Sequence, residues 1–262
     1  MVTDNDRFSR SLLLLGQEKM ERLRECRVIL FGVGGVGSWC AESLVRTGLC
    51  HLDIVDFDSV SESNINRQLM ATVNTVGLPK VEVLRERLLS INPDAVITAR
   101  RELFNGDTAA GFDLDSYDYV IDAIDSLKDK ALLIERACNS HAKLFSSMGA
   151  ALKLDPTRIQ VAEFWKVYGD PLARALRNRF KREKQFPKRK FLCVFSDELL
   201  ENQTDAYEEW GSDRKDTDTV DLRQSDQDRI RFKSPNGSLS HITAIFGFTL
   251  AGLVIKDICK KK

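Results

Sequence analysis

Short apolar runs alternate with amphipathic segments along the first half of the chain. This alternation is typical of a parallel sheet whose strands are connected by helices. It predicts strands at 27–31, 51–55, 95–100 and 119–123, and helices at 37–47, 80–91 and 127–141. An amphipathic segment from about Arg7 to Arg24 precedes the first strand. We therefore expect an α/β, Rossmann-like fold with a mostly parallel sheet and helices on both faces.

The hydrophobic pattern changes from about Lys143 onward. A predicted strand at 144–147 is followed by a turn at 155–158 and an alternating strand at 159–164. This hairpin-like order predicts that antiparallel strands extend the sheet. The longest apolar run, 242–255, is shorter than the roughly 18 residues that a membrane span requires. It predicts a buried terminal helix and no membrane partner.

No linker or repeat divides the chain, so we expect 1–262 to form a single domain. Its expected parts are an N-terminal helical segment, a nucleotide-binding core and an extension, at 1–25, 26–142 and 143–262. The N-terminus is polar and has no apolar stretch typical of a signal peptide, which favours a cytoplasmic location.

Charge is balanced over the chain but not within it. The formal net charge is zero, which excludes an overall field that attracts nucleic acid or membrane. Residues 172–190 are nevertheless strongly basic, whereas acidic and small polar residues dominate 200–230. The basic segment, Arg174–Lys190, is either a solvated helix face or a contact to a phosphate backbone. The acidic stretch lacks a period and predicts a long mobile loop.

The six cysteines are scattered and form no C-x-x-C pair, so we expect no structural zinc. Cys193 lies in an apolar run that predicts a strand. A buried thiol has little nucleophilic character, so this context favours a core cysteine over a catalytic one.

The strongest motif follows the first predicted strand. Gly32, Gly34 and Gly37 have the G-x-G-x-x-G spacing of a turn between a strand and a helix. Such a turn lets a phosphate approach the backbone and the amides at the start of the helix. The next predicted strand ends at Asp56, which is placed to accept a ribose hydroxyl. Taken alone, this arrangement suits an NAD-dependent oxidoreductase.

The segment after Asp56 favours a nucleoside triphosphate instead. It is rich in groups that bind phosphate, and its candidate ligand residues are Asp58, Asn64, Arg67, Gln68 and Lys80. Arginine can contact phosphate with two hydrogen bonds and lysine acts as a point charge, and both would stabilise charge that develops during attack on an α-phosphate. Each residue also has a structural alternative: Lys80 could be solvated surface and Arg67 a cap within an asparagine-rich turn.

Two carboxylates follow the strand at 119–123. Asp125 is a candidate ligand for Mg²⁺, which prefers one or two carboxylates together with phosphate oxygens. Asp122 and Asp125 could instead cap the helix that begins at Leu127. The sequence alone leaves both interpretations open.

These motifs together resemble the ubiquitin-activating-enzyme-like (ThiF/MoeB-type) adenylyltransferase superfamily. The resemblance extends over nearly the whole chain, and within the superfamily it is most specific for the tRNA threonylcarbamoyladenosine dehydratases. The general motifs are RFSR, GVGGVGS, VDFDSVSESNINRQ, GLPK and IDAIDS. Those specific to the branch lie at 35–39, 46–48, 155–161, 170–173, 193–198 and 237–240.

The resemblance implies a site and a reaction. Gly34, Gly35 and Gly37 would hold ATP, Asp56 its ribose, and Asn64, Arg67 and Lys80 its phosphates, with Asp125 at Mg²⁺. Arg10 would reach the ATP site of the other subunit of a homodimer. The expected reaction is adenylation of the threonyl carboxylate of a modified adenosine beside the tRNA anticodon, followed by ring closure.

Three other functions remain possible at this stage. The chain could adenylate the C-terminus of a ubiquitin-like or sulfur-carrier protein, which would imply a sulfur-transfer partner. It could be an oxidoreductase, or a binding module with a vestigial nucleotide pocket. The phosphate-binding groups around Arg67 argue against both of the latter.

Overall fold

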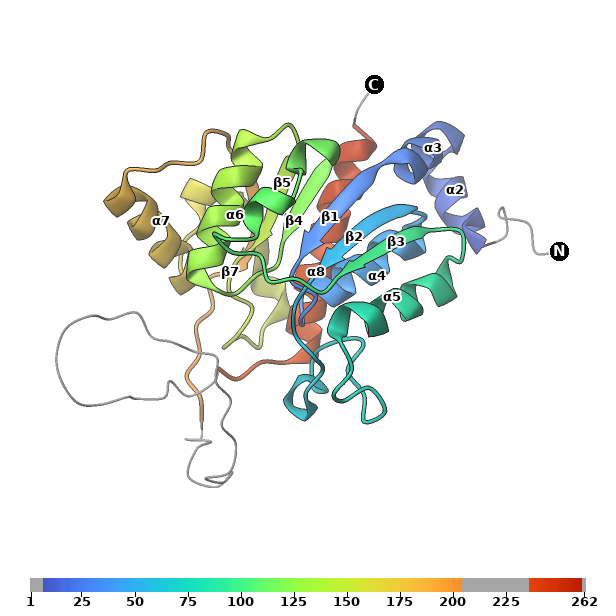
Figure 1. Cartoon of the computed structure of the whole chain (residues 1–262). Helices are drawn as coiled ribbons and strands as arrows, with labels where there is room; N and C mark the ends of the chain where they lie inside the picture. The colour runs from blue at the N-terminus through green and yellow to red at the C-terminus, as the bar shows by residue number, and fades with distance from the viewer. Residues whose placement is uncertain (1–6, 204–235, 261–262) are drawn as a thin grey trace.

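The computed structural model describes residues 7–203 and 236–260, and within them a seven-stranded sheet lies between two layers of helices (Figure 1). The strand order is β3-β2-β1-β4-β5-β7-β6, and all neighbouring strands are parallel except β7 and β6. The strands are β1 (Arg27–Phe31), β2 (His51–Val55), β3 (Val96–Arg100), β4 (Tyr119–Asp122), β5 (Lys143–Ser147), β6 (Ile159–Glu163) and β7 (Leu192–Ser196). The predicted Rossmann-like fold class is confirmed.

The helices cover both faces because the central strands are apolar on both sides. In β1, Val28 and Leu30 belong to one hydrophobic cluster, and Ile29 and Phe31 belong to the other. This alternation follows from the two-residue period of a strand. The first cluster includes residues of α3 (Gln17–Glu25), α4 (Gly37–Thr47), α5 (Lys80–Ile91) and α8 (Ser240–Ile258). The second includes residues of α6 (Leu127–Asn139) and α7 (Pro171–Glu183).

The antiparallel extension is confirmed for one strand, β6, but the hairpin-like order did not indicate its position. β7 lies between β5 and β6 and is parallel to β5. Four of the five residues of β7 are buried, whereas β6 is only partly buried along its length. A strand that is apolar on both faces gains more from a central position, so β6 takes the edge. α7 makes the crossover that a parallel β7 requires.

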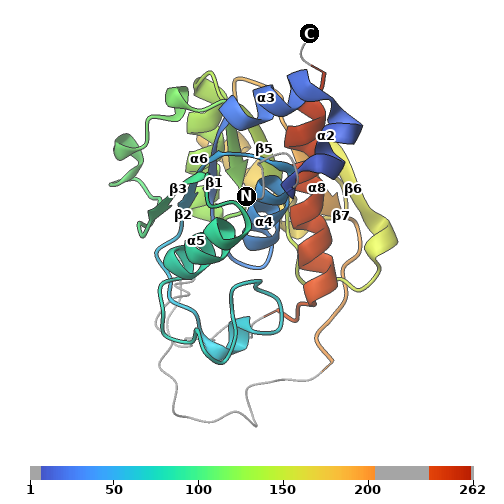
Figure 2. The same cartoon turned by 90° about the vertical axis from the view of Figure 1, so that its right-hand side faces the viewer.

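The predicted terminal helix is confirmed and is longer than the apolar run. By length and composition α8 could cross a membrane, since it has 19 residues and a mean hydropathy of 1.5. Half of its apolar stretch is nevertheless buried inside the molecule. Figure 2 shows α8 beside α4. A Cβ at Gly247 would lie 2.4 Å from the carbonyl oxygen of Val36, so the two helices are in backbone contact. α8 is therefore a core helix.

The N-terminal amphipathic segment divides at Gly16, where φ is +80°. It forms α2 (Ser9–Leu15) and α3, which lie at the edge of the sheet where β2 and β3 begin. Phe8 packs near Gly48, and Arg7 donates hydrogen bonds to Asn92 and Asp94. Most of the predicted acidic loop at 200–230 lies outside the described residues.

Candidate nucleotide-binding site

The glycine turn has the geometry that its spacing predicts. Gly32 follows β1 with φ +85°, and a Cβ there would lie 2.7 Å from the carbonyl oxygen of Ala123. A Cβ at Gly37 would lie 1.8 Å from the carbonyl oxygen of Gly32, so the start of α4 packs directly on the end of β1. At Gly34 the nearest atom to a Cβ would be the Gln68 amide nitrogen, at 3.8 Å. The turn is thus tight at its ends and open at its centre.

Asp56 lies beside this turn, directly after β2. Its Oδ2 accepts a hydrogen bond from the Val33 amide at 2.9 Å, and its Oδ1 accepts one from the Asp58 amide at 3.0 Å. Burial raises the pKa of Asp56, and the charge of Lys80 partly opposes that shift. Each carboxylate oxygen has a further lone pair, so a hydroxyl donor could still be accommodated.

Lys80 is buried beside Asp58 and does not belong to the solvated surface. Its side chain is 7% exposed, and its Nζ lies 2.6 Å from Asp58 Oδ2. The Lys80 amide also donates to the Asp58 carbonyl at 3.0 Å. The alternative that Lys80 is a solvated helix residue was therefore wrong. Asp58 holds the ammonium group near Asp56, where it can act on an anion.

The loop between Asp58 and Lys80 brings three more candidates to the turn. Asn64 is buried and accepts a hydrogen bond from the Ser61 amide, which closes the short helix η1 (Glu62–Asn64). The Arg67 guanidinium donates to the Ser63 carbonyl and the Asn66 amide oxygen, both at 2.8 Å. Burial lowers the pKa of Arg67, and Asp125 partly offsets this. Gly35 is in contact with this arginine, since a Cβ there would lie 3.3 Å from Arg67 Cγ.

Gln68 supplies an observation that points to a ligand. It is 6% exposed, and its Oε1 is one of two buried side-chain oxygen or nitrogen atoms without a hydrogen-bond partner among the described residues. An unpaired buried polar atom costs about 1–3 kcal/mol. The amide nitrogen of the same side chain lies nearest to Gly34, so it is the group that can donate to a ligand phosphate, whereas Oε1 can be satisfied only by a ligand group that donates, such as a hydroxyl or an amino group. The site thus fits a nucleotide.

Asp122 and Asp125 have different environments. Neither caps α6, because the N-cap is Ser126, whose hydroxyl accepts from the Asp129 amide. The capping alternative was therefore wrong. Asp122 is fully buried in an ion pair of 2.8 Å with Lys130. Asp125 is exposed, and its negative charge interacts with the Arg67 guanidinium. The described residues contain no group of three or more potential metal ligands, so Asp125 could hold Mg²⁺ only together with phosphate oxygens.

Comparison with known proteins identifies the family. Residues 8–262 match the model of the ThiF family. The chain belongs to the ThiF family. It is 36% identical to the tRNA threonylcarbamoyladenosine dehydratase of Bacillus subtilis (strain 168), over 97% of this chain and 94% of that protein. It is 34% identical to the enzyme of the same name from Escherichia coli (strain K12), with the same coverage.

Solved structures agree with this assignment. The crystal structure of the E. coli enzyme in complex with ATP has a TM-score of 0.81 and 32% identity, covering 98% of this chain and 96% of that one. The complex of the same enzyme with AMP has a TM-score of 0.82. E. coli MccB shares the fold alone, with a TM-score of 0.61 and 18% identity.

In this ThiF-family chain, Arg10 is not brought to the glycine turn. It is exposed on α2, at the edge of the sheet where strands begin, whereas the turn lies at the edge where β1 and β2 end. Within one chain the two features are on opposite edges. The predicted role of Arg10 therefore depends on a second copy.

The basic segment contains two arginines that maintain the fold. The Arg189 guanidinium donates to the carbonyls of Ala137 and Ala142, at 2.8 and 2.7 Å, and so caps the end of α6. Arg177 donates to the Phe164 carbonyl at 3.1 Å. Exposed cations remain on the outer side of α7 and after it, namely Arg174, Lys181, Arg182, Lys184, Lys188 and Lys190. These can attract an anionic partner.

Cys193 is fully buried in β7, and burial raises its pKa well above the usual value. Its thiol is therefore neutral and shielded, as expected for a core cysteine.

Sequence reasoning missed Lys130, which is fully buried and also donates to the Ile124 carbonyl at 2.9 Å. The signal was available in the helix period, since Lys130, Ile134 and Ala137 share the buried face of α6.

Proposed function

We propose that this chain is an ATP-dependent tRNA threonylcarbamoyladenosine dehydratase. The observation that carries the proposal is the set of groups around the open glycine turn: Asp56, Arg67, Gln68 and Lys80. Relatives that bear this name match along almost their full length, and one of them binds ATP in its crystal structure. The whole chain, 1–262, would work as one ATP-binding adenylation domain.

The chemistry proposed is activation of a carboxylate. An oxygen of the threonyl carboxylate attacks the α-phosphorus of ATP, which forms an acyl-adenylate and releases pyrophosphate. Negative charge increases on the phosphoryl oxygens during this step, and Arg67 and Lys80 are placed to stabilise it. Mg²⁺ would neutralise charge on the departing phosphates, with Asp125 as its protein ligand.

Ring closure then requires no protein nucleophile. A neighbouring group of the same modification attacks the acyl carbon, the bond to AMP breaks, and the net change is loss of one water from the nucleoside. Because both reacting groups belong to one molecule, their effective concentration is high. The burial of Cys193, which removes the one candidate nucleophile proposed from the sequence, is consistent with this pathway.

The partners follow from the surface. The tRNA backbone would contact the exposed cations of Arg174–Lys190. A homodimer is supported by α2, where Arg10 cannot reach the site of its own chain and where Leu13 and Leu14 are 82% and 83% exposed. We place the enzyme in the cytoplasm, where tRNA is modified. A sulfur-transfer partner is implied only by the wider family and not by any contact described above.

The test measures pyrophosphate release from Mg·ATP. Release is expected with tRNA that carries threonylcarbamoyladenosine and not with the same tRNA lacking the modification. Release that requires the C-terminus of a ubiquitin-like protein would instead support adenylation of a protein. Release with neither substrate, or binding of NAD in place of ATP, would contradict the proposal.

A further inference from the structure

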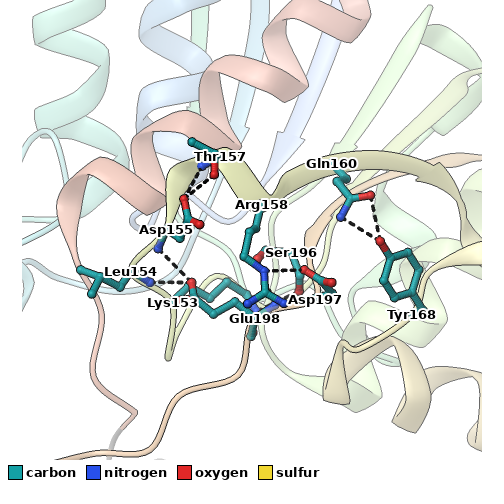
Figure 3. Close-up of polar contacts among 10 residues, drawn as sticks. All are labelled: Lys153, Leu154, Asp155, Thr157, Arg158, Gln160, Tyr168, Ser196, Asp197 and Glu198. Carbon is teal, nitrogen blue, oxygen red and sulfur yellow. Dashed lines mark hydrogen bonds and ion pairs between the residues drawn. The ribbon is translucent and has the colours of Figure 1, made fainter.

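A second cluster of polar side chains lies at the edge of the sheet that carries the glycine turn (Figure 3). β7 ends at Ser196 and pairs there with Ile159, the first residue of the antiparallel β6. The segments 153–158 and 197–198 consequently lie side by side at this edge. β7 is three strands from β1, a separation of about 14 Å at ~4.8 Å per strand. The segments 155–161 and 193–198 meet here, and Gly169, directly before 170–173, packs against Asp197.

A buried network makes this surface rigid. Lys153 is 4% exposed, and its Nζ donates to the carbonyls of Ser196 and Glu198, at 3.0 and 2.6 Å. The Glu198 carboxylate in turn accepts from the amides of Leu154 and Asp155, at 2.8 and 2.9 Å. Because these charged groups already bond to the backbone, they act as a scaffold for what lies above them.

Tyr168 is an exposed aromatic residue at this edge, and it is held in place by its own contacts. It is 53% exposed, although a tyrosine ring gains free energy from burial. Its hydroxyl accepts from Gln160 Nε2 at 3.0 Å and donates to Gln160 Oε1 at 3.1 Å. Its ring lies edge-on to the buried Phe195, with centroids 5.4 Å apart. The following residue, Gly169, has φ +70° and packs against Asp197, so the backbone is also held.

Cations occur on both segments that adjoin this ring, namely the start of β6 and α7. Arg158, whose side chain is 45% exposed, lies directly before β6 and is paired with Asp197 at 2.9 Å (Figure 3). α7 begins three residues after Tyr168 and carries exposed cations, with Arg174 in its first turn. An aromatic ring presented rigidly beside cations is the arrangement with which proteins stack unpaired bases while they bind the phosphate backbone.

We propose that Tyr168 is a stacking platform for an unpaired base of the anticodon loop. This inference rests on the proposed function. The reacting carboxylate must reach the α-phosphate at the glycine turn, and it is joined to its base by a short chain. In this proposal the loop that carries the base extends along this edge toward β7, the side on which α7 carries its exposed cations. Tyr168 lies on that path, between the nucleotide turn and the cations of α7, and would hold the loop as the carboxylate approaches.

The test compares the variants Tyr168→Leu and Tyr168→Phe with the wild-type protein. The ligand is a fluorescent RNA stem–loop that carries threonylcarbamoyladenosine, and binding is followed by anisotropy in the presence of ATP. Loss of one stacked base predicts that Tyr168→Leu weakens binding between about 5-fold and 150-fold. Tyr168→Phe keeps the ring and should remain within about twofold. Affinity for ATP should be unchanged in both variants.

A blunt RNA duplex of equal length is the matched control, since it offers phosphates without unpaired bases. Its affinity should be the same for Tyr168→Leu and the wild type. Equal affinity of the two proteins for the stem–loop would overturn the inference, as would an equal loss for stem–loop and duplex. If the wild-type protein releases pyrophosphate with the modified tRNA in either case, the proposed function survives and only the role of Tyr168 fails.

Discussion

The buried ion pair beneath the nucleotide site gives a quantitative prediction. Asp122 and Lys130 are both fully buried, with 2.8 Å between Asp122 Oδ2 and Lys130 Nζ. The same ammonium donates to the Ile124 carbonyl at 2.9 Å, and Asp122 Oδ1 accepts from the Ile124 amide at 3.1 Å. The pair thus binds both the amide and the carbonyl of Ile124, the residue directly before Asp125. The Ile124 amide nitrogen lies close to Gly32.

The perturbation is Lys130→Met, which keeps the length of the side chain and removes its charge. Removing one partner of a buried pair leaves the other charge uncompensated and costs about 3–5 kcal/mol. Asp122 retains hydrogen bonds from the Ser146 hydroxyl and the Ile124 amide, so we expect the lower end, about 3 kcal/mol. Adding Asp122→Asn removes both charges and should recover about 1–2 kcal/mol of that loss.

The assay is urea unfolding at pH 7, followed by circular dichroism, with the slope m compared among variants. Lys128→Met is the matched control, because Lys128 is exposed on the same helix and its loss should change stability by no more than about 0.5 kcal/mol. A second readout is ATP affinity, which should fall in Lys130→Met because the segment against Gly32 is no longer held. A loss below about 1 kcal/mol at unchanged m, or a double variant whose loss equals the sum of the two single losses, would refute the reasoning.

Three further predictions concern the site and its supports. Gly37→Ala forces a methyl group against the Gly32 carbonyl and should cost about 1–3 kcal/mol with loss of ATP binding; normal ATP affinity by calorimetry would contradict the tight turn. Burial alone would raise the pKa of Glu42, but the hydrogen bonds from Arg87 and Arg46 outweigh burial and lower it. Glu42 therefore stabilises the fold above pH 4.5, and this stabilisation is lost as the pH falls below that value. The wild type should be about 1–2 kcal/mol more stable than Glu42→Gln at pH 7, and this difference should disappear in acid. Replacing the exposed cations Arg174, Lys181 and Lys188 with Glu should lower tRNA affinity at least tenfold without changing ATP affinity. Unchanged tRNA affinity would show that the tRNA binds elsewhere.

The sequence was sufficient to predict the features that depend on residues close together along the chain. The glycine turn, the strands around it and the acid at the end of β2 follow from local spacing, and the structure has them as expected. The order of β5, β7 and β6 did not follow, because it depends on pairing across long loops. Only the hydrogen bonds that Arg189 donates to the carbonyls of Ala137 and Ala142 distinguish it from the exposed cations near it. The polar network around Lys153 was likewise invisible, since its partners are backbone groups more than forty positions away.

The central claim is that the site closes a ring on a modified adenosine. The direct measurement incubates the purified protein with Mg·ATP and tRNA that carries threonylcarbamoyladenosine, then determines the mass of the modified nucleoside. We expect a nucleoside lighter by one water, formed together with AMP and pyrophosphate and absent when ATP is omitted. A nucleoside of unchanged mass, under conditions where ATP binds and the tRNA is bound, would contradict the account.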